Sequence, residues 1–469
     1  MIFNSYLFIG FLAINLAVYW TLKSWTARKL QLLIASYLFY AAWNPPFVLL
    51  LLLSTAVDYA LGKRLQVTES QSIRRTLLAA SLLVNLGMLA WFKYASFFLA
   101  SLVDLLHAIG IEYAPPQLDL VLPVGISFYT FQTLSYTIDL YRRRIDASRS
   151  LLDFAVYVSF FPQLVAGPIV RASEFLHQLK QPPTFRAAHR DWGITLIVLG
   201  LFQKVVLADS LVSRVADAVY AHTGPLSTAD AWLGTIAFAW QILFDFAGYS
   251  TIAIGVAMLF GFGLPRNFHW PYAASGFSDF WRRWHISLSG WLRDYLYIPL
   301  GGNRGSTIAT SRNLLLTMLL GGLWHGAAWT FVAWGGIHGV LLITERRLRE
   351  ASSVFARCLD QGWAIPVTFP IVCVTWVFFR ANDFVQASTL LSRMFLLHPG
   401  MQVLSLTDAA TISALTLVGL MVSIWFRNQT LEDVWSQIPR PVAAMIVIFM
   451  ALMIFSSPGD NRAFIYFQF

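Results

Sequence analysis

The chain has 469 residues, of which 57% are hydrophobic and only 12% are charged, and its mean hydropathy is +0.61. Soluble domains carry about 25% charged residues, so this composition excludes an ordinary soluble globular protein and predicts a polytopic membrane protein. The net charge of +9 comes from basic residues that gather in short loops, a pattern that orients membrane proteins and is weak evidence for nucleic-acid binding.

A series of apolar runs, most of them near the length of a membrane span, predicts an all-α polytopic membrane protein with about 10–12 transmembrane segments. The runs are 5–22, 30–43, 46–62, 76–100, 119–140, 151–170, 192–212, 231–262, 313–343, 362–381, 405–426 and 441–457. The two short runs on either side of Asn44-Pro45-Pro46 are expected to form a hairpin. No soluble domain or internal repeat is visible, so we expect one integral-membrane domain over 1–469.

Loop charges set the expected orientation. Basic residues lie at Lys23–Lys29, at Lys63–Arg75 and at Arg142–Arg144, whereas the 101–118 loop has no Lys or Arg. Cytoplasmic loops carry the excess of Lys and Arg, so these three basic loops are predicted to be cytoplasmic and the N-terminus to lie on the other side.

With this orientation, the runs at 151–170 and 313–343 each begin and end on the cytoplasmic side. Both contain helix breakers, such as Pro162 in the first run and Gly326 in the second. Irregular backbone at membrane depth is tolerated only inside protein or along a watery cavity. We therefore expect each run to be a re-entrant hairpin or a pair of short helices.

Polar residues line one face of the 231–262 run. Gln241, Asp245 and Tyr249 are spaced four apart, which places them together on a helix. A buried carboxylate needs a partner, and Asp245 is expected to orient a histidine or an arginine. The alternatives are a structural polar clamp and a direct part in the chemistry.

The stretch 278–300 combines aromatic and basic residues around a histidine. In a helix, Trp281, His285 and Leu288 share one face. Two compatible interpretations remain: an amphipathic helix on the anionic inner leaflet, and a basic mouth that attracts a polyanionic cofactor while His285 points inward. The other faces carry three arginines: Arg282, Arg283 and Arg293.

His325 stands between Gly322 and Gly326 in an apolar run. Ionisable groups inside the membrane are costly, so their default interpretation is functional. A neutral imidazole here suits a general base, and convergence with His285 would indicate proton-transfer chemistry. The alternative is a packing histidine bonded to a backbone carbonyl. For His338, a structural role in helix packing is the favoured interpretation.

Several chemistries leave no signature in the chain. There is no GxSxG elbow, P-loop, dinucleotide fingerprint, HExxH motif or zinc-ligand spacing. Cys358 and Cys373 form no CxxC pair. We expect neither a metal nor a bound cofactor.

Four stretches together resemble the membrane-bound O-acyltransferase family, in the branch of bacterial alginate and exopolysaccharide O-acetyltransferases. A fifth, Trp376–Ala381, is similar to the late segment of that family. The four stretches are Phe161-Pro162-Gln163-Leu164-Val165-Ala166-Gly167-Pro168, Phe244-Asp245-Phe246-Ala247-Gly248-Tyr249-Ser250, Phe280-Trp281-Arg282-Arg283-Trp284-His285-Ile286-Ser287-Leu288-Ser289 and Gly322-Leu323-Trp324-His325-Gly326-Ala327-Ala328-Trp329.

The resemblance implies a cytoplasm-facing funnel, a catalytic histidine at His325, as base or transient acyl carrier, and a second important histidine at His285. An acyl group, most simply acetyl, would come from a cytoplasmic thioester, either acetyl-coenzyme A or an acylated carrier protein. A periplasmic or membrane-anchored acetyltransferase partner would complete O-acetylation of a secreted polysaccharide such as alginate. The chain would lie in the cell inner membrane with a periplasmic N-terminus. Candidates for donor or substrate binding are Arg282, Arg283, Arg293, Trp324, Asp245 and Tyr249.

Three alternatives stay open at this point. One is D-alanyl or other acyl transfer to a cell-wall polymer, although two apolar segments after Arg380 favour the exopolysaccharide branch. Another is a non-enzymatic transporter with the histidines as a proton relay, which would usually show paired carboxylates, whereas Asp245 is expected to stand alone. The third is a scaffold for an export complex, in which the histidines would be dispensable.

Overall fold

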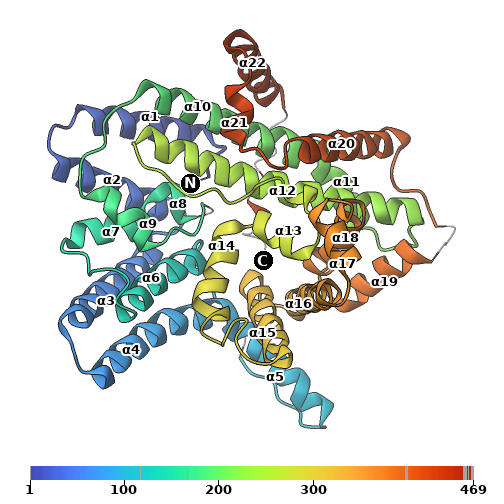
Figure 1. The fold of residues 1–469 in the computed structure, drawn as a ribbon, viewed down its shortest axis with the longest axis horizontal. Helices are drawn as coiled ribbons and strands as arrows, with labels where there is room; N and C mark the ends of the chain where they lie inside the picture. The colour runs from blue at the N-terminus through green and yellow to red at the C-terminus, as the bar shows by residue number, and fades with distance from the viewer. Residues whose placement is uncertain are drawn as a thin grey trace. The chain divides into compact units, whose positions relative to one another are not determined.

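The computed structural model describes residues 2–116, 118–165, 167–396, 400–457, 462, 464 and 465. Within them the regular structure is helical and contains no strand, which confirms the all-α prediction (Figure 1). The chain divides into two compact units: unit 1 comprises Met1–Ile194 and Ala253–Pro265, and unit 2 comprises Thr195–Ile252 and Arg266–Phe469. One integral-membrane domain over 1–469 stays a prediction.

Unit 1 is a set of apolar helices followed by short helical pieces. Its elements are α1 (Tyr6–Thr21), α2 (Trp25–Ala41), η1 (Pro45–Phe47), α3 (Val48–Val67), α4 (Gln71–Leu89), η2 (Ala90–Tyr94), α5 (Ala95–Ala108), α6 (Ile126–Tyr141), α7 (Leu151–Ser159), α8 (Phe161–Leu164), α9 (Ala172–Phe175), η3 (Leu176–Leu179) and the first half of α10 (Ala187–Leu201). The Pro45-Pro46 turn separates α2 from α3, as expected for a hairpin.

In unit 1, proline and glycine interrupt the helices inside the predicted apolar runs. The 151–170 run folds as the predicted pair of short helices, α7 and α8. The 119–140 run becomes helical only at Ile126, because Pro123 precedes it and Gly125 has φ +78°. A Cβ at Gly125 would stand 2.5 Å from the carbonyl oxygen of Leu164, so only glycine fits there.

Unit 2 holds the histidine motifs. Its elements are the end of α10, η4 (Phe202–Val212), α11 (Ser213–Tyr220), most of α12 (Thr228–Leu259), η5 (Pro271–Ala273), α13 (Phe277–Arg283), α14 (Ile286–Leu292), η6 (Arg293–Tyr297), α15 (Thr307–His325), α16 (Trp329–Ala351), α17 (Ser353–Asp360), α18 (Ile365–Arg380), α19 (Phe384–Phe395), α20 (Leu406–Trp425), α21 (Leu431–Ser436) and α22 (Arg440–Ser456).

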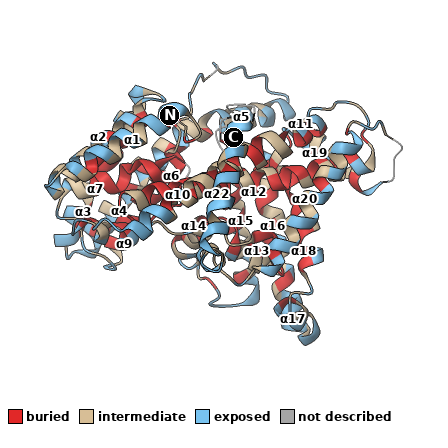
Figure 2. Cartoon of the chain, turned by 90° about the horizontal axis from the view of Figure 1, so that it is seen from above, coloured by how far each residue is buried: buried red, intermediate tan, exposed pale blue. Residues whose placement is uncertain are grey.

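α12 is the most buried of the long apolar helices. In its apolar part 78% of the residues are buried, compared with 11% in α20, and Figure 2 shows the contrast in colour. Gln241, Asp245 and Tyr249 lie on this one continuous helix, as predicted. A helix buried on nearly every face can bring polar groups into the protein interior, where they must find partners.

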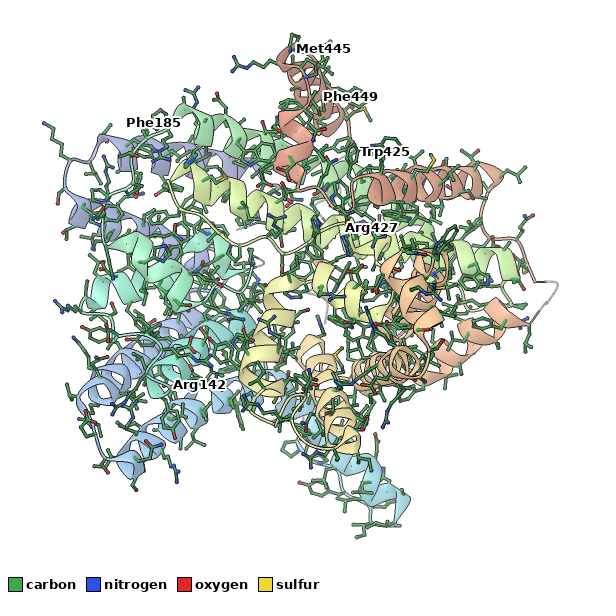
Figure 3. All side chains as sticks on the ribbon, in the orientation of Figure 1. Arg142, Phe185, Trp425, Arg427, Met445 and Phe449 are labelled. Atoms are coloured by element: carbon green, nitrogen blue, oxygen red, sulfur yellow. The ribbon has the colours of Figure 1, made fainter. Side chains whose placement is uncertain are left out.

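Helices of membrane-spanning length are fewer than the predicted ten to twelve segments. Five helices among the described residues are long and apolar enough to cross a membrane, and six if the bent pair α17 and α18 counts as one span; α1 and α22 are shorter. Several apolar runs instead fold as short or broken helices. The exposed side chains of Trp425, Met445 and Phe449 are large and apolar, as suits a lipid-facing surface (Figure 3).

The 313–343 run forms two helices, as expected from its glycines. α15 and α16 are separated by Gly326, Ala327 and Ala328 and pack closely along their length. A Cβ at Gly322 would lie 2.2 Å from the carbonyl oxygen of Phe331, and one at Gly335 would lie 2.2 Å from that of Met318. Close backbone approach through small residues is characteristic of helix pairs in membranes. The glycines therefore fix where α15 ends, at His325.

Candidate active site

The chain is broken between α13 and α14, and His285 lies at the break. Trp284 is extended and His285 has φ +43°, in the left-handed region. The expected single helix through 278–300, with Trp281 and Leu288 on the face of His285, is therefore wrong. A bulky residue at positive φ costs about 1–3 kcal/mol and persists only when its surroundings enforce it.

Hydrogen bonds to Asn267 hold His285 in this conformation. The backbone carbonyl of Asn267 accepts the N–H of Ile286 at 2.9 Å, and its side-chain oxygen accepts the hydroxyl of Ser287 at 2.9 Å and lies 3.0 Å from Nδ1 of His285. Because an amide oxygen only accepts, Nδ1 carries the proton of the neutral ring and Nε2 keeps its lone pair. Nε2 is buried and has no hydrogen-bond partner within the described part of the chain.

The environment keeps His285 uncharged. Its side chain is fully buried in the break between two short helices, outside the long apolar helices. Burial lowers the pKa of His285 to about 3. The imidazole is thus neutral at physiological pH, and a neutral imidazole is the form that accepts a proton.

His325 is the last residue of α15, and it is held among aromatic rings. It is 2% exposed, and its ring centroid lies 5.1 Å from that of Trp334 and 5.5 Å from that of Phe379. The chain then turns away through Gly326, where a Cβ would lie 2.1 Å from the ring of Phe331. The helix end and the glycine together present the imidazole to a buried, mostly apolar site.

The two predicted histidines converge. The ring centroids of His285 and His325 are 6.1 Å apart. Trp324 lies beside both, with its centroid 5.9 Å from His285 and 5.0 Å from His325. Two buried imidazoles at this separation, one of them fixed as a neutral tautomer, form an arrangement suited to moving a proton.

His338 has the structural role that was expected of it. Its Nδ1 accepts the indole N–H of Trp281 at 3.3 Å, and its Nε2 lies 3.0 Å from the hydroxyl of Thr375. Both ring nitrogens are therefore engaged within the protein, which confirms the packing interpretation.

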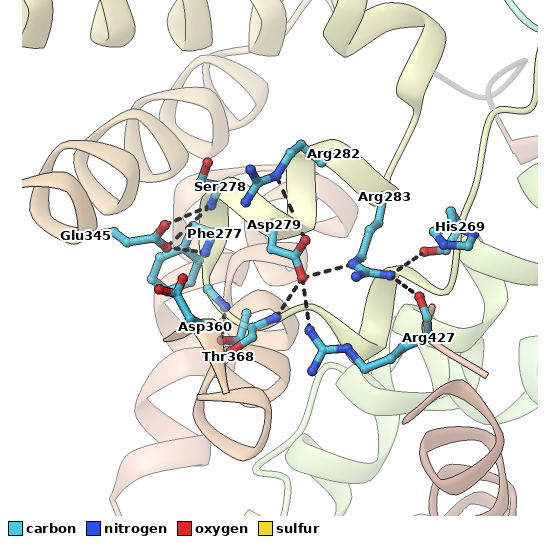
Figure 4. A network of polar contacts seen from close by, with 12 residues as sticks. His269, Phe277, Ser278, Asp279, Arg282, Arg283, Glu345, Asp360, Thr368 and Arg427 are labelled. Atoms are coloured by element: carbon cyan, nitrogen blue, oxygen red, sulfur yellow. Dashed lines mark hydrogen bonds and ion pairs between the residues drawn. The ribbon is translucent and has the colours of Figure 1, made fainter. Parts of the chain in front are cut away.

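The three arginines of the basic stretch differ in their surroundings. The side chains of Arg282 and Arg293 are 67% and 64% exposed. Arg283 is held inside, with Nε donating to Asp279 at 2.9 Å and Nη1 donating to the carbonyl of Arg427 at 2.7 Å (Figure 4). Arg283 therefore anchors α13, whereas Arg282 lies at the surface and Arg293 lies there in a two-bond pair with the carboxylate of Asp294.

Asp245 has partners that sequence reasoning missed. Lys204 lies between two carboxylates, with Nζ 2.6 Å from Asp245 and 2.9 Å from Asp209. All three side chains are at most 6% exposed. The expectations that Asp245 stands alone and that it orients a histidine or an arginine are therefore wrong. Tyr249, one turn along α12, lies with its ring 5.7 Å from the ammonium of Lys204.

The residues that sequence reasoning missed differ in how much signal they leave in the sequence. Lys204 and Asp209 are charges five residues apart inside the apolar 192–212 run, and an ionisable residue in such a run is a functional or structural signal by itself. Asn267 carries no comparable signal. It lies in a loop, and its contacts with 285–287 depend on how the loop folds back.

Comparison with known proteins identifies the family of the chain. The sequence model described as "MBOAT, membrane-bound O-acyltransferase family" matches residues 141–379, a range that contains both histidines. The "Probable alginate O-acetylase AlgI" of Azotobacter vinelandii is 43% identical over 427 residues, which cover 90% of this chain and 83% of that protein.

Two further relatives act on other polymers by name. The "Peptidoglycan O-acetyltransferase" of Helicobacter pylori is 37% identical, over 84% of this chain and 80% of that protein. The "Teichoic acid D-alanyltransferase" of Bacillus subtilis is more distant, at 26% identity over 58% of this chain and 71% of that protein.

The family match covers half of the chain, and the AlgI relative covers nine-tenths of it. Both agree with the all-helical fold and its apolar helices. The chain belongs to the membrane-bound O-acyltransferase family and is a multi-pass membrane enzyme that transfers acyl groups to oxygen.

Proposed function

We propose that this enzyme moves an acetyl group from a cytoplasmic thioester across the membrane for O-acetylation of a secreted polysaccharide such as alginate, with His325 as the catalytic base and His285 as its partner. The observation that carries the proposal is the buried pair of imidazoles, 6.1 Å between ring centroids, at the end of α15 and the break before α14. The names of the relatives at 43% and 37% identity support O-acetylation of an envelope or secreted polymer.

In the proposed reaction, a ring nitrogen of His325 removes the proton from an acceptor hydroxyl. The hydroxyl oxygen attacks the thioester carbonyl, the C–S bond breaks, and the proton passes to the departing thiolate. The products are an ester and a free thiol, so no oxidant or reductant is consumed. His285 assists because its neutral ring places no second positive charge beside the imidazolium that forms at His325.

The donor is proposed to be a cytoplasmic thioester, either acetyl-coenzyme A or an acylated carrier protein, with no cofactor bound permanently. The exposed guanidinium groups of Arg282 and Arg293 would attract its anionic part. We place the chain in the cell inner membrane with a periplasmic N-terminus, on the charge of its loops. A periplasmic or membrane-anchored acetyltransferase partner would complete the transfer to the polysaccharide.

The test is the acetyl content of the polysaccharide in cells that carry His325→Ala, with membrane levels of the protein measured alongside. Loss of a positioned base typically costs about 10²–10⁴-fold, so we expect acetylation to vanish at a normal protein level. His189→Ala is the matched control, because His189 is exposed at the start of α10. Acetylation that persists in the His325 variant would remove the base assignment and favour a transporter or scaffold.

A further inference from the structure

Unit 2 contains a polar cavity that the histidine pair does not use. Its volume is about 340 Å³, and charged groups of both signs line it, among them Lys204, Asp217, Asp245, Arg380 and Arg462. A cavity of this polarity inside an apolar helical protein needs an explanation, because buried charges are stable only with partners.

The late segment, defined as Arg462, Phe464 and Ile465, lies far along the chain from the helices that it touches, and its Arg462 and Ile465 form part of the cavity wall. Asp217 on α11 bridges two guanidinium groups: Oδ1 lies 3.1 Å from Arg380, and Oδ2 pairs with Arg462. One carboxylate thus ties the segment to α18 as well as to α11. Paired charges that are only partly exposed resist screening better than surface pairs.

A second bond fixes the segment deeper in the protein. The backbone N–H of Ile465 donates to Oδ2 of Asp245 at 2.7 Å, and this bond is buried. The other oxygen of Asp245 faces Lys204. Hydrogen bonds to an ionised acceptor are stronger than those between neutral groups, and a buried carboxylate oxygen left without such a bond destabilises the protein. Asp245 is therefore completed by the segment.

These two bonds place Phe464 against the residues behind the active site. Phe464 is fully buried, with its ring centroid 4.6 Å from that of Tyr249 and 5.5 Å from that of Phe246. Phe246 in turn packs edge-on against His285, at 4.7 Å between centroids. Phe464 is thus linked to the imidazole through the ring of Phe246.

We propose that Asp217 and Asp245 are positioning residues, which through Arg462 and the N–H of Ile465 hold Phe464 against Phe246, behind His285, for acyl transfer. The inference rests on the proposed function of the histidine pair. The inference concerns residues other than the histidine pair, and none of these residues touches the reacting groups.

The experiment compares Arg462→Met with Arg462→Lys in the full chain, by polysaccharide acetyl content, membrane level and melting temperature in detergent. We expect the Met variant to lose at least about tenfold in acetylation, because small misplacements near reacting groups cost that much or more. The Lys variant keeps the charge and recovers most of the activity, which a role in packing alone does not explain. Arg440→Met is the control, since Arg440 is exposed at the start of α22.

A second pair of variants tests the buried bond. Ile465→Pro removes the N–H that Asp245 accepts, whereas Ile465→Ala keeps it, so only the proline variant should lose acetylation. Wild-type acetylation in both Arg462→Met and Ile465→Pro overturns the inference, and so does a rise in acetylation, which would make the segment a plug. Failure of the proposed function can be told apart from failure of this inference, because it would appear as acetylation that persists in His325→Ala.

Discussion

At the scale of the residue, the geometry of His285 is imposed by its neighbours. The ring is oriented by Asn267, which uses both its backbone carbonyl and its side-chain oxygen on the 285–287 turn. The left-handed backbone of His285 would be relaxed by glycine, yet glycine would leave the Asn267 oxygen without the ring N–H. The same contacts with Asn267 therefore hold the left-handed backbone of His285 and keep the proton on Nδ1. With the proton there, Nε2 keeps its lone pair.

The burial of His285 predicts an acid-sensitive stability. Its pKa in the folded protein is about 3, below the value near 6.5 of the unfolded chain, so the unfolded state binds the proton first as the pH falls. Stability is therefore lost from about pH 6.5 downward, by about 2 kcal/mol at pH 5 from this one group.

The measurement is the melting temperature in detergent at pH 7.5 and pH 5.0. We expect His285→Asn to show a smaller acid-induced decrease than the wild type, since asparagine does not titrate. His189→Asn, at an exposed position, should leave the decrease unchanged. An equal decrease in all three proteins would show that His285 is not the group that titrates.

At the scale of the element, the junction of α15 and α16 rests on glycines whose roles differ. A Cβ at Gly335 would stand 2.2 Å from the backbone oxygen of Met318, which cannot move without shifting α15. A Cβ at Gly336 would instead stand 3.2 Å from the side chain of Leu319, which can rotate. Alanine at Gly335 and alanine at Gly336 therefore test different effects: the first tests backbone packing, and the second tests helix propensity.

We expect Gly335→Ala to destabilise the protein by about 3 kcal/mol or more and to lower acetylation together with the amount of folded protein, because overpacking at backbone contacts is poorly relieved. Gly336→Ala should lie within about 1 kcal/mol of the wild type, since alanine is the better helix former. Melting temperatures of the two purified variants decide the matter, and equal values would contradict the geometry of the junction.

The same elements show what the sequence could predict. Breakers inside the apolar runs 151–170 and 313–343 predicted a re-entrant hairpin or a pair of short helices in each, because proline and glycine act locally, and the structure shows pairs, with the second divided at Gly326. The break at His285 was missed, since it depends on Asn267, eighteen residues earlier, and no periodicity reports such a contact. The Lys204 cluster joins η4 to α12: its charges were visible inside the apolar 192–212 run, but their pairing with Asp245 depends on how the two helices pack.

At the scale of the whole molecule, the apolar surface is the property that ties the chain to the lipid. On α22 the side chains of Met445, Phe449 and Leu452 are 60%, 57% and 62% exposed. An apolar surface of this kind is stable only when something apolar covers it, and lipid is the partner that the composition of the chain predicts.

This assignment predicts how a cysteine at Phe449 reacts. In a background with Cys358→Ser and Cys373→Ser, Phe449→Cys should stay unlabelled by a membrane-impermeant maleimide in intact membranes and become labelled after denaturation in detergent. The reason is that a membrane-impermeant reagent does not enter lipid, so a thiol on a lipid-facing side of α22 stays out of its reach. Glu432→Cys, on the exposed first turn of α21, should be labelled in open membranes without denaturation. Labelling of Phe449→Cys at the rate of Glu432→Cys would mean that α22 lies in water, and the exposed apolar face would then need a protein partner instead of lipid.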